Sequence, residues 1–355
     1  MLGALLLAEG LARLADPVLP QWTAHAGEGS AIMAGHPTRL WGNQAGGVRQ
    51  NGGATASIND LGLRGAVPGP RSGERLLVLG DSTAFGHGVE EGQAYIDVAG
   101  EELRARGVQV DTVNGAVAGY SIAQTRLLMD EVGWSLDPTL LVISNLWSDN
   151  TFDAFHDEDL LASARLGAMN PLAHSAALRL LASALGSPGG GRIITVSRLD
   201  PWPEGTVRRV PLERYAALME GLVQEARERG VGVVFVRNAN VHIVEGPIPG
   251  GPPIWQPYFQ VMQELADHHG VPLVEVSSVF EGAQDQALFL DLMHPTPLGH
   301  RLIGQELAAT LLDADWPSER LLGSATPSST SVQDLPPPSG QDDSGAGSPQ
   351  QRLFE

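Results

Sequence analysis

Three side chains in this sequence have the types and the spacing that nucleophilic chemistry requires. Ser82 ends the tripeptide Gly80-Asp81-Ser82, directly after a short apolar run. Much later in the chain, Asp291 precedes His294 by three residues, so its carboxylate can reach Nδ1 of the imidazole within one turn of chain. Nε2 of His294 is then free to take a proton from a hydroxyl. A serine, a base and a carboxylate that orients the base are the groups of nucleophilic acyl transfer, so these three are the predicted catalytic residues.

A fourth candidate is Gly119, in the stretch Val113-Asn-Gly-Ala-Val-Ala-Gly-Tyr-Ser121 after a second apolar run. Without a side chain, a glycine lets its backbone N–H approach a ligand closely. Gly119 is followed by a predicted helix, which suits a donor to a developing oxyanion. The alternative, a plain glycine turn between strand and helix, stays open.

The elements that would position these residues alternate along the chain from residue 74 to about residue 315. The strand candidates are residues 76–79, which form a continuous apolar run, and residues 108–113, 140–144, 231–236 and 273–276. Apolar residues at helical spacing predict helices at residues 91–106, 121–132, 212–229, 257–269 and 298–312. This alternation is typical of an α/β fold with a parallel sheet between two layers of helices. Ser82 would then lie at the carboxyl edge of the sheet, where such folds bind ligands.

The rest of the chain is predicted to be appended to this domain. Residues 1–73 form an apolar start and an extended arm, residues 151–210 an insertion with one helix at 173–185, and residues 316–355 a disordered tail. The first apolar residues are either an amphipathic helix or the end of a truncated membrane helix. Asn59, Gly62 and Gly65 indicate a tight turn. Arg64 within it either reaches an acidic group near the site or, as we favour, is a surface arginine.

Composition excludes several classes of function. The chain of 355 residues is 43% hydrophobic, as a globular protein with a sizeable core requires. A formal net charge of -19 excludes a nucleic-acid partner, because phosphate binding needs a clustered positive surface. The absence of cysteine excludes disulfides and thiolate metal sites. No metal site is predicted, since the spacing of these histidines does not suggest one: His156, His174, His242 and His300.

Taken together, the motifs around Ser82, Gly119 and His294 resemble those of the SGNH (GDSL-type) hydrolases over about residues 74–315. The resemblance implies a flavodoxin-like three-layer α/β/α sandwich with a five-stranded parallel sheet. It also implies a serine esterase without a metal or organic cofactor. Ser82 would be the nucleophile and an oxyanion donor through its own N–H, Gly119 the second donor, His294 the base and Asp291 its orienter. Residues 59–65 also look like a segment that precedes the domain in membrane-anchored bacterial members.

One motif departs from that family. Members usually carry Gly-x-Asn-Asp after the third strand, and the asparagine amide is the third oxyanion donor. This chain reads Ile143-Ser-Asn-Leu-Trp-Ser-Asp-Asn150 there, which places Ser148 at the asparagine position when Asp149 is kept in register. A shift in register brings in Asn150 or, less favourably, Asn145. Ser148 and Asn150 are therefore the candidates for the third donor.

The sequence thus predicts hydrolysis of a small-molecule or glycan ester through an acyl-Ser82 intermediate. Two alternatives stay open, namely acetyl transfer to or from a bacterial glycan by the same triad, and carbohydrate binding on a hydrolase fold that has lost its activity. The resemblance and the apolar first residues favour an exported or membrane-anchored protein, and the oligomeric state is left unassigned.

Six aromatic residues either stack on the substrate or, as we favour, pack the insertion onto the sheet: Trp147, Phe152, Phe155, Trp202, Trp255 and Tyr258.

Overall fold

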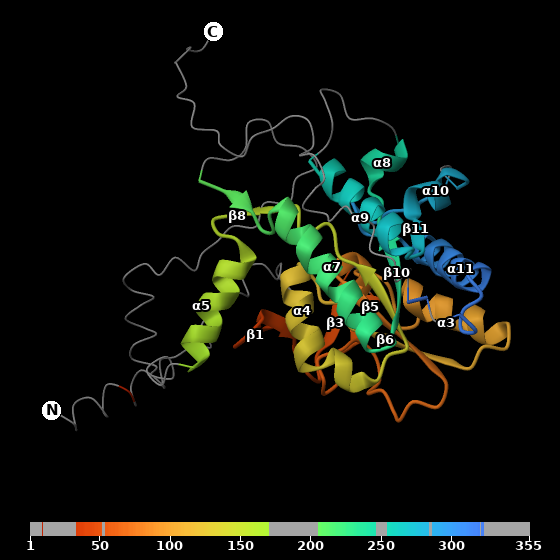
Figure 1. Ribbon diagram of the computed structural model, residues 1–355, viewed down its shortest axis with the longest axis horizontal. Helices are drawn as coiled ribbons and strands as arrows, with labels where there is room; N and C mark the ends of the chain where they lie inside the picture. The colour runs from red at the N-terminus through yellow and green to blue at the C-terminus, as the bar shows by residue number, and fades with distance from the viewer. Residues whose placement is uncertain are drawn as a thin grey trace, which may run out of the picture. The chain divides into compact units, whose positions relative to one another are not determined.

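The fold is built around a five-stranded parallel sheet. The computed structural model describes Glu9 and residues 33–51, 54–169, 205–245, 254–283, 286–319 and 321–322. The strands are β5 (Glu74–Gly80), β6 (Val110–Asn114), β7 (Leu140–Ser144), β10 (Gly232–Arg237) and β11 (Leu273–Glu275), and their order is β11-β10-β7-β5-β6. Neighbouring strands are parallel throughout (Figure 1). The predicted fold class is therefore confirmed.

The apolar runs form strands because both faces of the sheet are covered. All five residues of β7 are buried, as the unbroken run of apolar residues predicts for a central parallel strand. In β5, Leu76 and Val78 contribute to the core beneath α3 and α11, whereas Leu77 and Leu79 point to the opposite face. Each fully buried side chain of this kind contributes about 1.5–3 kcal/mol to folding.

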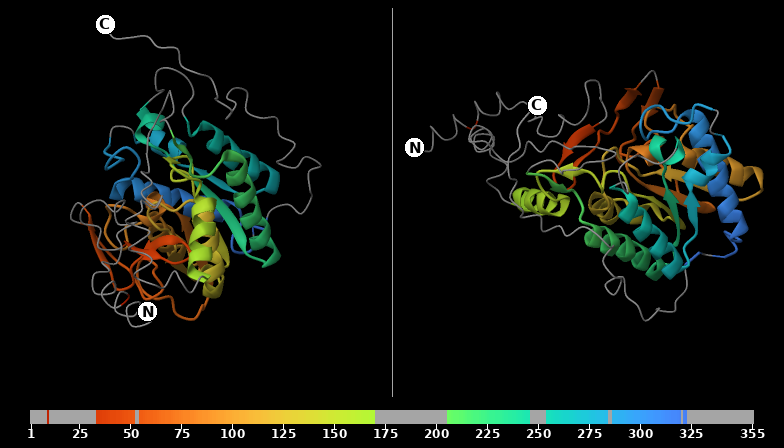
Figure 2. Two further views of the ribbon diagram at one scale, coloured as in Figure 1. Left: turned by 90° about the vertical axis from the view of Figure 1, so that its left-hand side faces the viewer. Right: turned by 90° about the horizontal axis from the view of Figure 1, so that it is seen from above.

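The two helical layers cover opposite faces of the sheet. Helices α3 (Tyr95–Ala105) and α11 (Pro297–Asp313) pack on one face, and α4 (Ile122–Glu131), α7 (Leu212–Glu228) and α9 (Gln256–His269) pack on the other (Figure 2). These five helices confirm the sequence prediction to within a few residues at each end. Two helix ends are capped: Gly270 is left-handed after α9, and the Thr296 hydroxyl accepts the N–H of Gly299 at the start of α11.

The amino-terminal arm contains two hairpins that the sequence did not predict. β1 (Met33–His36) pairs with β2 (Leu40–Asn43), and β3 (Val48–Asn51) pairs with β4 (Ala54–Ser57). Each strand has only four residues, too few to show an alternation that could be recognised in the sequence. The predicted turn after β4 is confirmed, because Asn59 Oδ1 accepts the N–H groups of Leu61 and Leu63.

Several short elements complete the described residues: α2 (Ser82–Phe85), η1 (Gly133–Leu136), β8 (Phe152–Asp153), α5 (Asp157–Met169), β9 (Val207–Arg208), α8 (Val241–Glu245) and α10 (Val276–Glu281). Within the insertion, the predicted helix at 173–185 lies outside the described residues, as do residues 1–8 and the tail from residue 323. Among the described residues, no helix has the length and apolar character that crossing a membrane requires.

Candidate active site

The fold brings Ser82, His294 and Asp291 into one hydrogen-bonded line, although Ser82 and His294 are 212 residues apart in the sequence. Ser82 Oγ lies 2.8 Å from His294 Nε2. His294 Nδ1 lies 2.7 Å from Asp291 Oδ2. With Nδ1–H donating to the carboxylate, Nε2 has a lone pair directed at the serine hydroxyl. This is the arrangement in which an imidazole removes a proton from an attacking serine.

Asp291 is held in place by its own loop. Its Oδ1 accepts the backbone N–H groups of Met293 and His294, both at 3.0 Å. Partial burial raises the pKa of Asp291, but the hydrogen bond and charge of His294 and the two N–H groups outweigh it and hold the pKa below its usual range. The side chain is 52% exposed. Asp291 is therefore an ionised acceptor that orients His294 from a site open to water.

The turn that presents Ser82 depends on Gly80 and Asp81. A Cβ at Gly80 would lie 2.9 Å from the Cβ of Ala84 and 3.1 Å from the carbonyl oxygen of Ser144, so a side chain does not fit there. Asp81 then caps α2, because its Oδ1 accepts the N–H (3.0 Å) and the hydroxyl (2.8 Å) of Thr83. Ser82, the candidate nucleophile, is thus the first residue of a capped helical turn at the end of β5.

Asp81 also ties this turn to the neighbouring loop, a role that we did not predict. Its Oδ2 accepts the N–H groups of Trp147 (3.1 Å) and Ser148 (3.2 Å), which follow β7. The carboxylate is fully buried and accepts four hydrogen bonds. The signal available in the sequence was an acidic residue directly before a short helix, which is typical of an N-cap. Its second pair of partners is a consequence of the fold.

Gly119 lies in the loop after β6, on the other side of Ser82. Its φ of 78° lies in the left-handed region that favours glycine. The arm packs on this loop, since the indole of Trp41 donates to the carbonyl of Ala118 at 3.0 Å and a Cβ at Gly119 would lie 3.3 Å from the same ring. Neither Ser82 N–H nor Gly119 N–H donates a hydrogen bond within the described part of the chain. Both backbone donors are therefore available to a ligand.

Ser148 and Asn150, the two candidates for the third donor, and the less favoured Asn145 differ in how their side chains are used. Asn150 Nδ2 donates to the carbonyl of Leu146 at 3.0 Å, and Asn145 Nδ2 donates to the hydroxyl of Thr125 at 3.0 Å. Both asparagines are buried. Ser148 lies beside Asp81, and its hydroxyl makes no hydrogen bond with another described residue. Ser148 is thus the candidate whose donor is uncommitted.

Asp149, between two of these candidates, is a buried acid with an incomplete set of partners. Its Oδ1 accepts the N–H of Ile122 at 2.7 Å, and its Oδ2 is buried and accepts no hydrogen bond from a described residue. Burial raises the pKa of Asp149 well above its usual value, against the opposing effects of Ile122 N–H and Arg209. The folded protein therefore retains a proton that the unfolded chain releases above about pH 4.

This retained proton leads to a prediction about stability. Because the folded state binds more protons than the unfolded state above about pH 4, the contribution of Asp149 to the free energy of unfolding falls as the pH rises. We therefore expect the free energy of unfolding to fall less between about pH 5 and about pH 8 in Asp149→Asn than in the wild type, as measured by urea unfolding at both pH values. Asp130→Asn, an exposed position on α4, is the control. An unchanged difference in Asp149→Asn would contradict the prediction.

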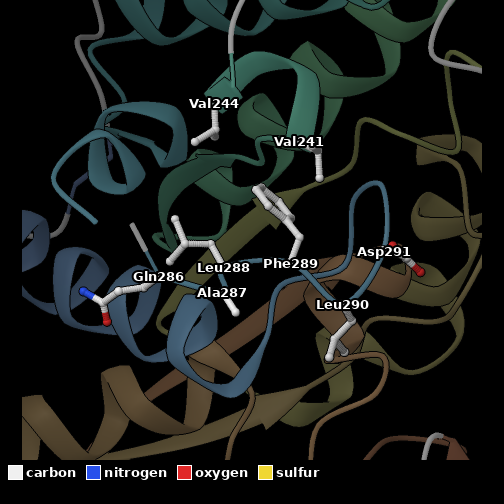
Figure 3. Close-up of a pocket in the computed structure, with 8 residues that line it drawn as sticks. All are labelled: Val241, Val244, Gln286, Ala287, Leu288, Phe289, Leu290 and Asp291. Carbon is white, nitrogen blue, oxygen red and sulfur yellow. The ribbon is translucent and has the colours of Figure 1, made fainter. Parts of the chain in front are cut away.

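A cavity of about 490 Å³ lies on the Asp291 side of the triad. Figure 3 shows Leu288 and Phe289 pointing toward Val241 and Val244 of α8, whereas the carboxylate of Asp291 points away from this apolar wall. Gln286, Ala287 and Leu290 complete the lining. The cavity therefore places apolar side chains next to Asp291, within a lining that also exposes polar atoms.

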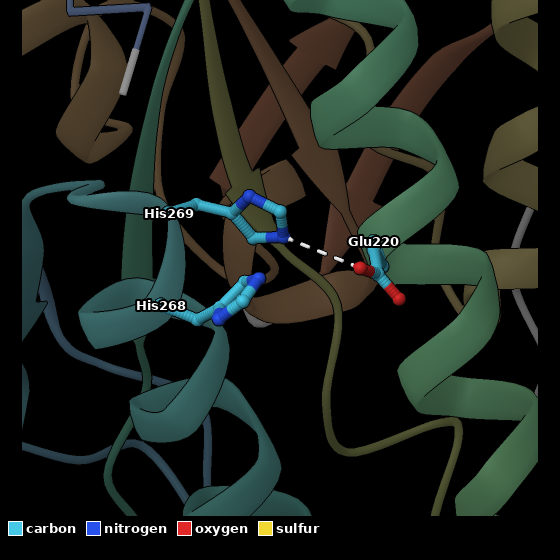
Figure 4. A group of neighbouring side chains, drawn as sticks. All are labelled: Glu220, His268 and His269. Carbon is cyan, nitrogen blue, oxygen red and sulfur yellow. Dashed lines mark ion pairs between the residues drawn. The ribbon is translucent and has the colours of Figure 1, made fainter. Parts of the chain in front are cut away.

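One side-chain cluster outside the triad has atoms that a metal ion could use. Potential ligand atoms of Glu220 on α7 and of His268 and His269 on α9 lie within 4.8 Å of one another. Figure 4 shows His269 Nε2 facing Glu220 Oε1 across 3.6 Å. However, Arg227 Nη2 lies 3.4 Å from His269 Nδ1, so the guanidinium disfavours a second cation and favours the tautomer with the proton on Nε2. The cluster does not share an element with the triad, and only the fold reveals it.

The aromatic residues after β7 are packed rather than presented to a ligand. Trp147 contacts the rings of Trp255 and Phe259, with centroids 5.7 and 5.8 Å apart. Phe152 and Tyr258 are fully buried, and Phe155 is exposed, whereas Trp202 lies outside the described residues. The burial of four of the six rings agrees with the packing interpretation.

Comparison with protein-family models and with curated proteins finds no match. Among solved structures, the chain is 16% identical to LAE5, an alpha/beta hydrolase from the metagenome of Lake Arreo in Spain, with a TM-score of 0.45 over 71% of this chain and 98% of LAE5. It is 16% identical to Axe2, an acetylxylan esterase from Geobacillus stearothermophilus, with a TM-score of 0.45 over 68% of this chain and 94% of Axe2. LAE5 and Axe2 are hydrolases. At this identity and TM-score, the similarities do not assign an activity to this chain.

Proposed function

We propose that this protein is a serine esterase that hydrolyses a carboxylic ester through an acyl-Ser82 intermediate, with residues 74–315 as the catalytic domain. The observation that carries the proposal is the line from Ser82 Oγ through His294 to Asp291, with contacts of 2.8 and 2.7 Å. This line favours catalysis over the alternative of a carbohydrate-binding protein without activity. A binding protein without activity has no requirement for a serine hydroxyl within hydrogen-bond distance of His294 Nε2, whereas a serine esterase does.

The geometry supports a two-step reaction. Ser82 Oγ attacks the ester carbonyl while His294 Nε2 takes the hydroxyl proton, and Asp291 stabilises the resulting imidazolium. The tetrahedral intermediate collapses when the imidazolium gives that proton to the departing alkoxide, which leaves as an alcohol. Water then attacks the acyl-serine with His294 as base, and the acid product and free Ser82 are released.

Three donors are placed to stabilise the oxyanion in this proposal: Ser82 N–H, Gly119 N–H and the Ser148 hydroxyl. A serine hydroxyl can rotate and is a weaker donor than the asparagine side-chain amide that family members usually carry after the third strand. We therefore expect the third donor to contribute less here than a well-oriented asparagine would.

Ser148→Ala tests this assignment. The variant is expected to lower kcat by about 10-fold, less than the 10²–10³-fold loss that follows removal of a well-oriented donor. KM is expected to change little, because the hydroxyl acts mainly on the transition state. Steady-state kinetics on an aryl acetate measure both constants. Asn150→Ala, which removes an amide used inside the loop, is expected to lower stability more than kcat. The opposite ranking of kcat between the two variants would transfer the role to Asn150.

The proposed function itself is tested by covalent labelling. A fluorophosphonate is expected to label the wild type, and mass spectrometry of the peptides to place the adduct on Ser82. Ser82→Ala is expected to lose both the label and the hydrolysis of a panel of aryl esters from acetyl to long-chain acyl groups. Repeating the reaction with a sugar acceptor separates hydrolysis from acyl transfer. Activity that persists in Ser82→Ala would overturn the proposal.

A further inference from the structure

A second histidine lies against the proposed base. The ring of His87 packs on the ring of His294, with centroids 4.3 Å apart and an angle of 33° between the planes. His87 follows α2 and returns toward the nucleophile, since its N–H donates to the carbonyl of Ser82 at 3.0 Å. His294 is therefore contacted at both ring nitrogens by Ser82 and Asp291, and on one face by His87.

The loop that carries His87 is fixed by the amino-terminal arm. Arg64 is only 5% exposed, so its interpretation as a surface arginine is wrong. Its Nη1 donates to the carbonyls of Phe85 (2.8 Å) and Gly86 (2.7 Å). Its Nη2 donates to the carbonyls of Val89 (2.9 Å) and Glu90 (2.7 Å). One guanidinium thus holds both ends of the loop whose middle residue is His87.

The loop has the backbone needed for this arrangement. Gly86 and Gly88, on either side of His87, have φ angles of 82° and 81°, which favour glycine. A Cβ at Gly86 would lie 2.8 Å from Arg64 Nη1, so the guanidinium approaches as closely as it does because the residue is glycine. The two left-handed residues turn the chain around His87 and direct its ring toward His294.

A face contact restrains a motion that the two edge contacts leave free. Hydrogen bonds at Nδ1 and Nε2 hold the imidazole along one line, but the ring can still tilt about that line. Asp291 is half exposed, so water competes for its hydrogen bond to His294. Misplacing a catalytic group by about 1 Å can cost up to about 10²-fold in rate. A flat ring packed on the face of His294 limits this tilt.

We propose that His87 is a positioning residue for His294, and that the arm takes part in the active site because Arg64 fixes the loop that presents His87. The inference rests on the proposed function of Ser82 and His294. It assigns to His87 no proton transfer and no contact with the substrate. The required property is a flat ring in van der Waals contact with the imidazole.

Two substitutions at His87 separate the ring from its nitrogens. His87→Ala removes the ring and is expected to lower kcat by about 10-fold, with KM within about twofold of the wild type. His87→Phe keeps a flat ring and is expected to restore kcat to within about threefold of the wild type. His268→Ala removes another partly buried histidine that packs on a histidine ring, on a helix that carries no triad residue, and is the control. A wild-type kcat in His87→Ala, a loss confined to KM, or a Phe variant no better than Ala would each overturn the positioning role.

Arg64→Lys tests the contribution of the arm. Lysine keeps the charge but has one nitrogen, which cannot hold four carbonyls, so kcat is expected to fall at least as far as in His87→Ala. Circular dichroism and thermal unfolding establish that each variant is folded, and the double variant with His87→Ala is expected to lose less than the product of the two effects. A folded Arg64→Lys with wild-type kcat, or fully multiplicative effects, would overturn the role of the arm.

The outcome is distinguishable from a failure of the proposed function. If Ser82→Ala abolishes fluorophosphonate labelling and hydrolysis while His87→Ala behaves as the wild type, only the inference about His87 fails. If the wild type is not labelled at Ser82 and hydrolyses no ester, the proposed function fails and the inference fails with it.

Discussion

His294→Gln is expected to lower kcat for ester hydrolysis by about 10⁴-fold or more, the largest effect of any single substitution outside Ser82. Glutamine keeps a polar side chain of similar length but cannot accept the proton of the Ser82 hydroxyl, which lies 2.8 Å from Nε2 in the wild type. Both the attack on the ester and the departure of the alcohol need that proton to move. The loss should therefore appear in kcat rather than in KM. Single-turnover and steady-state kinetics on an activated aryl ester measure the two constants.

Asp291→Asn is expected to lower kcat as well, but by less than His294→Gln does. Asparagine cannot hold the Nδ1–H tautomer as a carboxylate does, and for a buried triad aspartate this change costs about 10⁴-fold. Asp291 is half exposed, so water can replace part of its interaction with the imidazolium, and a loss of about 10²–10³-fold is expected. His242→Ala, on α8, is the control. A His294→Gln variant that retains more than about a tenth of the wild-type kcat would contradict the role of base.

The parts of the fold that the sequence predicted are those whose signals are local. The β7 strand is buried at every position and apolar from Leu140 to Ile143 because both faces of the sheet are covered, and α9 ends at Gly270 because a left-handed residue closes it. Ser82, Asp291 and His294 could be selected as candidates because their residue types and spacing, together with the resemblance to the SGNH hydrolases, suggest acyl-transfer chemistry. The edge of a parallel sheet then brings them together without further information.

The parts that the sequence did not predict depend on contacts whose partners have no sequence signature. Arg64 binds four backbone carbonyls, and any residue supplies a carbonyl, so nothing in the sequence distinguishes it from a surface arginine. The ring contact between His87 and His294 joins two loops that are far apart in the chain. The choice among Ser148, Asn150 and Asn145 depends on which of these side chains already has a hydrogen-bond partner, and those partners are known only from the structure.

Asp81→Asn is expected to lower both stability and activity, because Asp81 connects two of the loops that form the site. Its two carboxylate oxygens accept four hydrogen bonds, two from Thr83 and two from the N–H groups of Trp147 and Ser148. Asparagine has one oxygen, so its NH₂ group must face one pair of donors in a fully buried place. A buried donor without an acceptor costs about 1–3 kcal/mol, so a loss of about 3 kcal/mol in the free energy of unfolding is expected.

The two orientations of the asparagine have different consequences for catalysis. If its oxygen keeps Thr83, the α2 cap survives and the loop with Ser148 is released. If its oxygen keeps Trp147 and Ser148, the cap that presents Ser82 is lost instead. Either way the donors move relative to Ser82 Oγ, and kcat should fall by about 10²-fold or more even in the folded population.

Urea unfolding measures the stability of the variant, and the rate of fluorophosphonate labelling measures the reactivity of the site separately. Asp130→Asn, exposed on α4, is expected to change the unfolding free energy by less than about 0.5 kcal/mol. A fully active and stable Asp81→Asn would show that the four hydrogen bonds do not hold the two loops together.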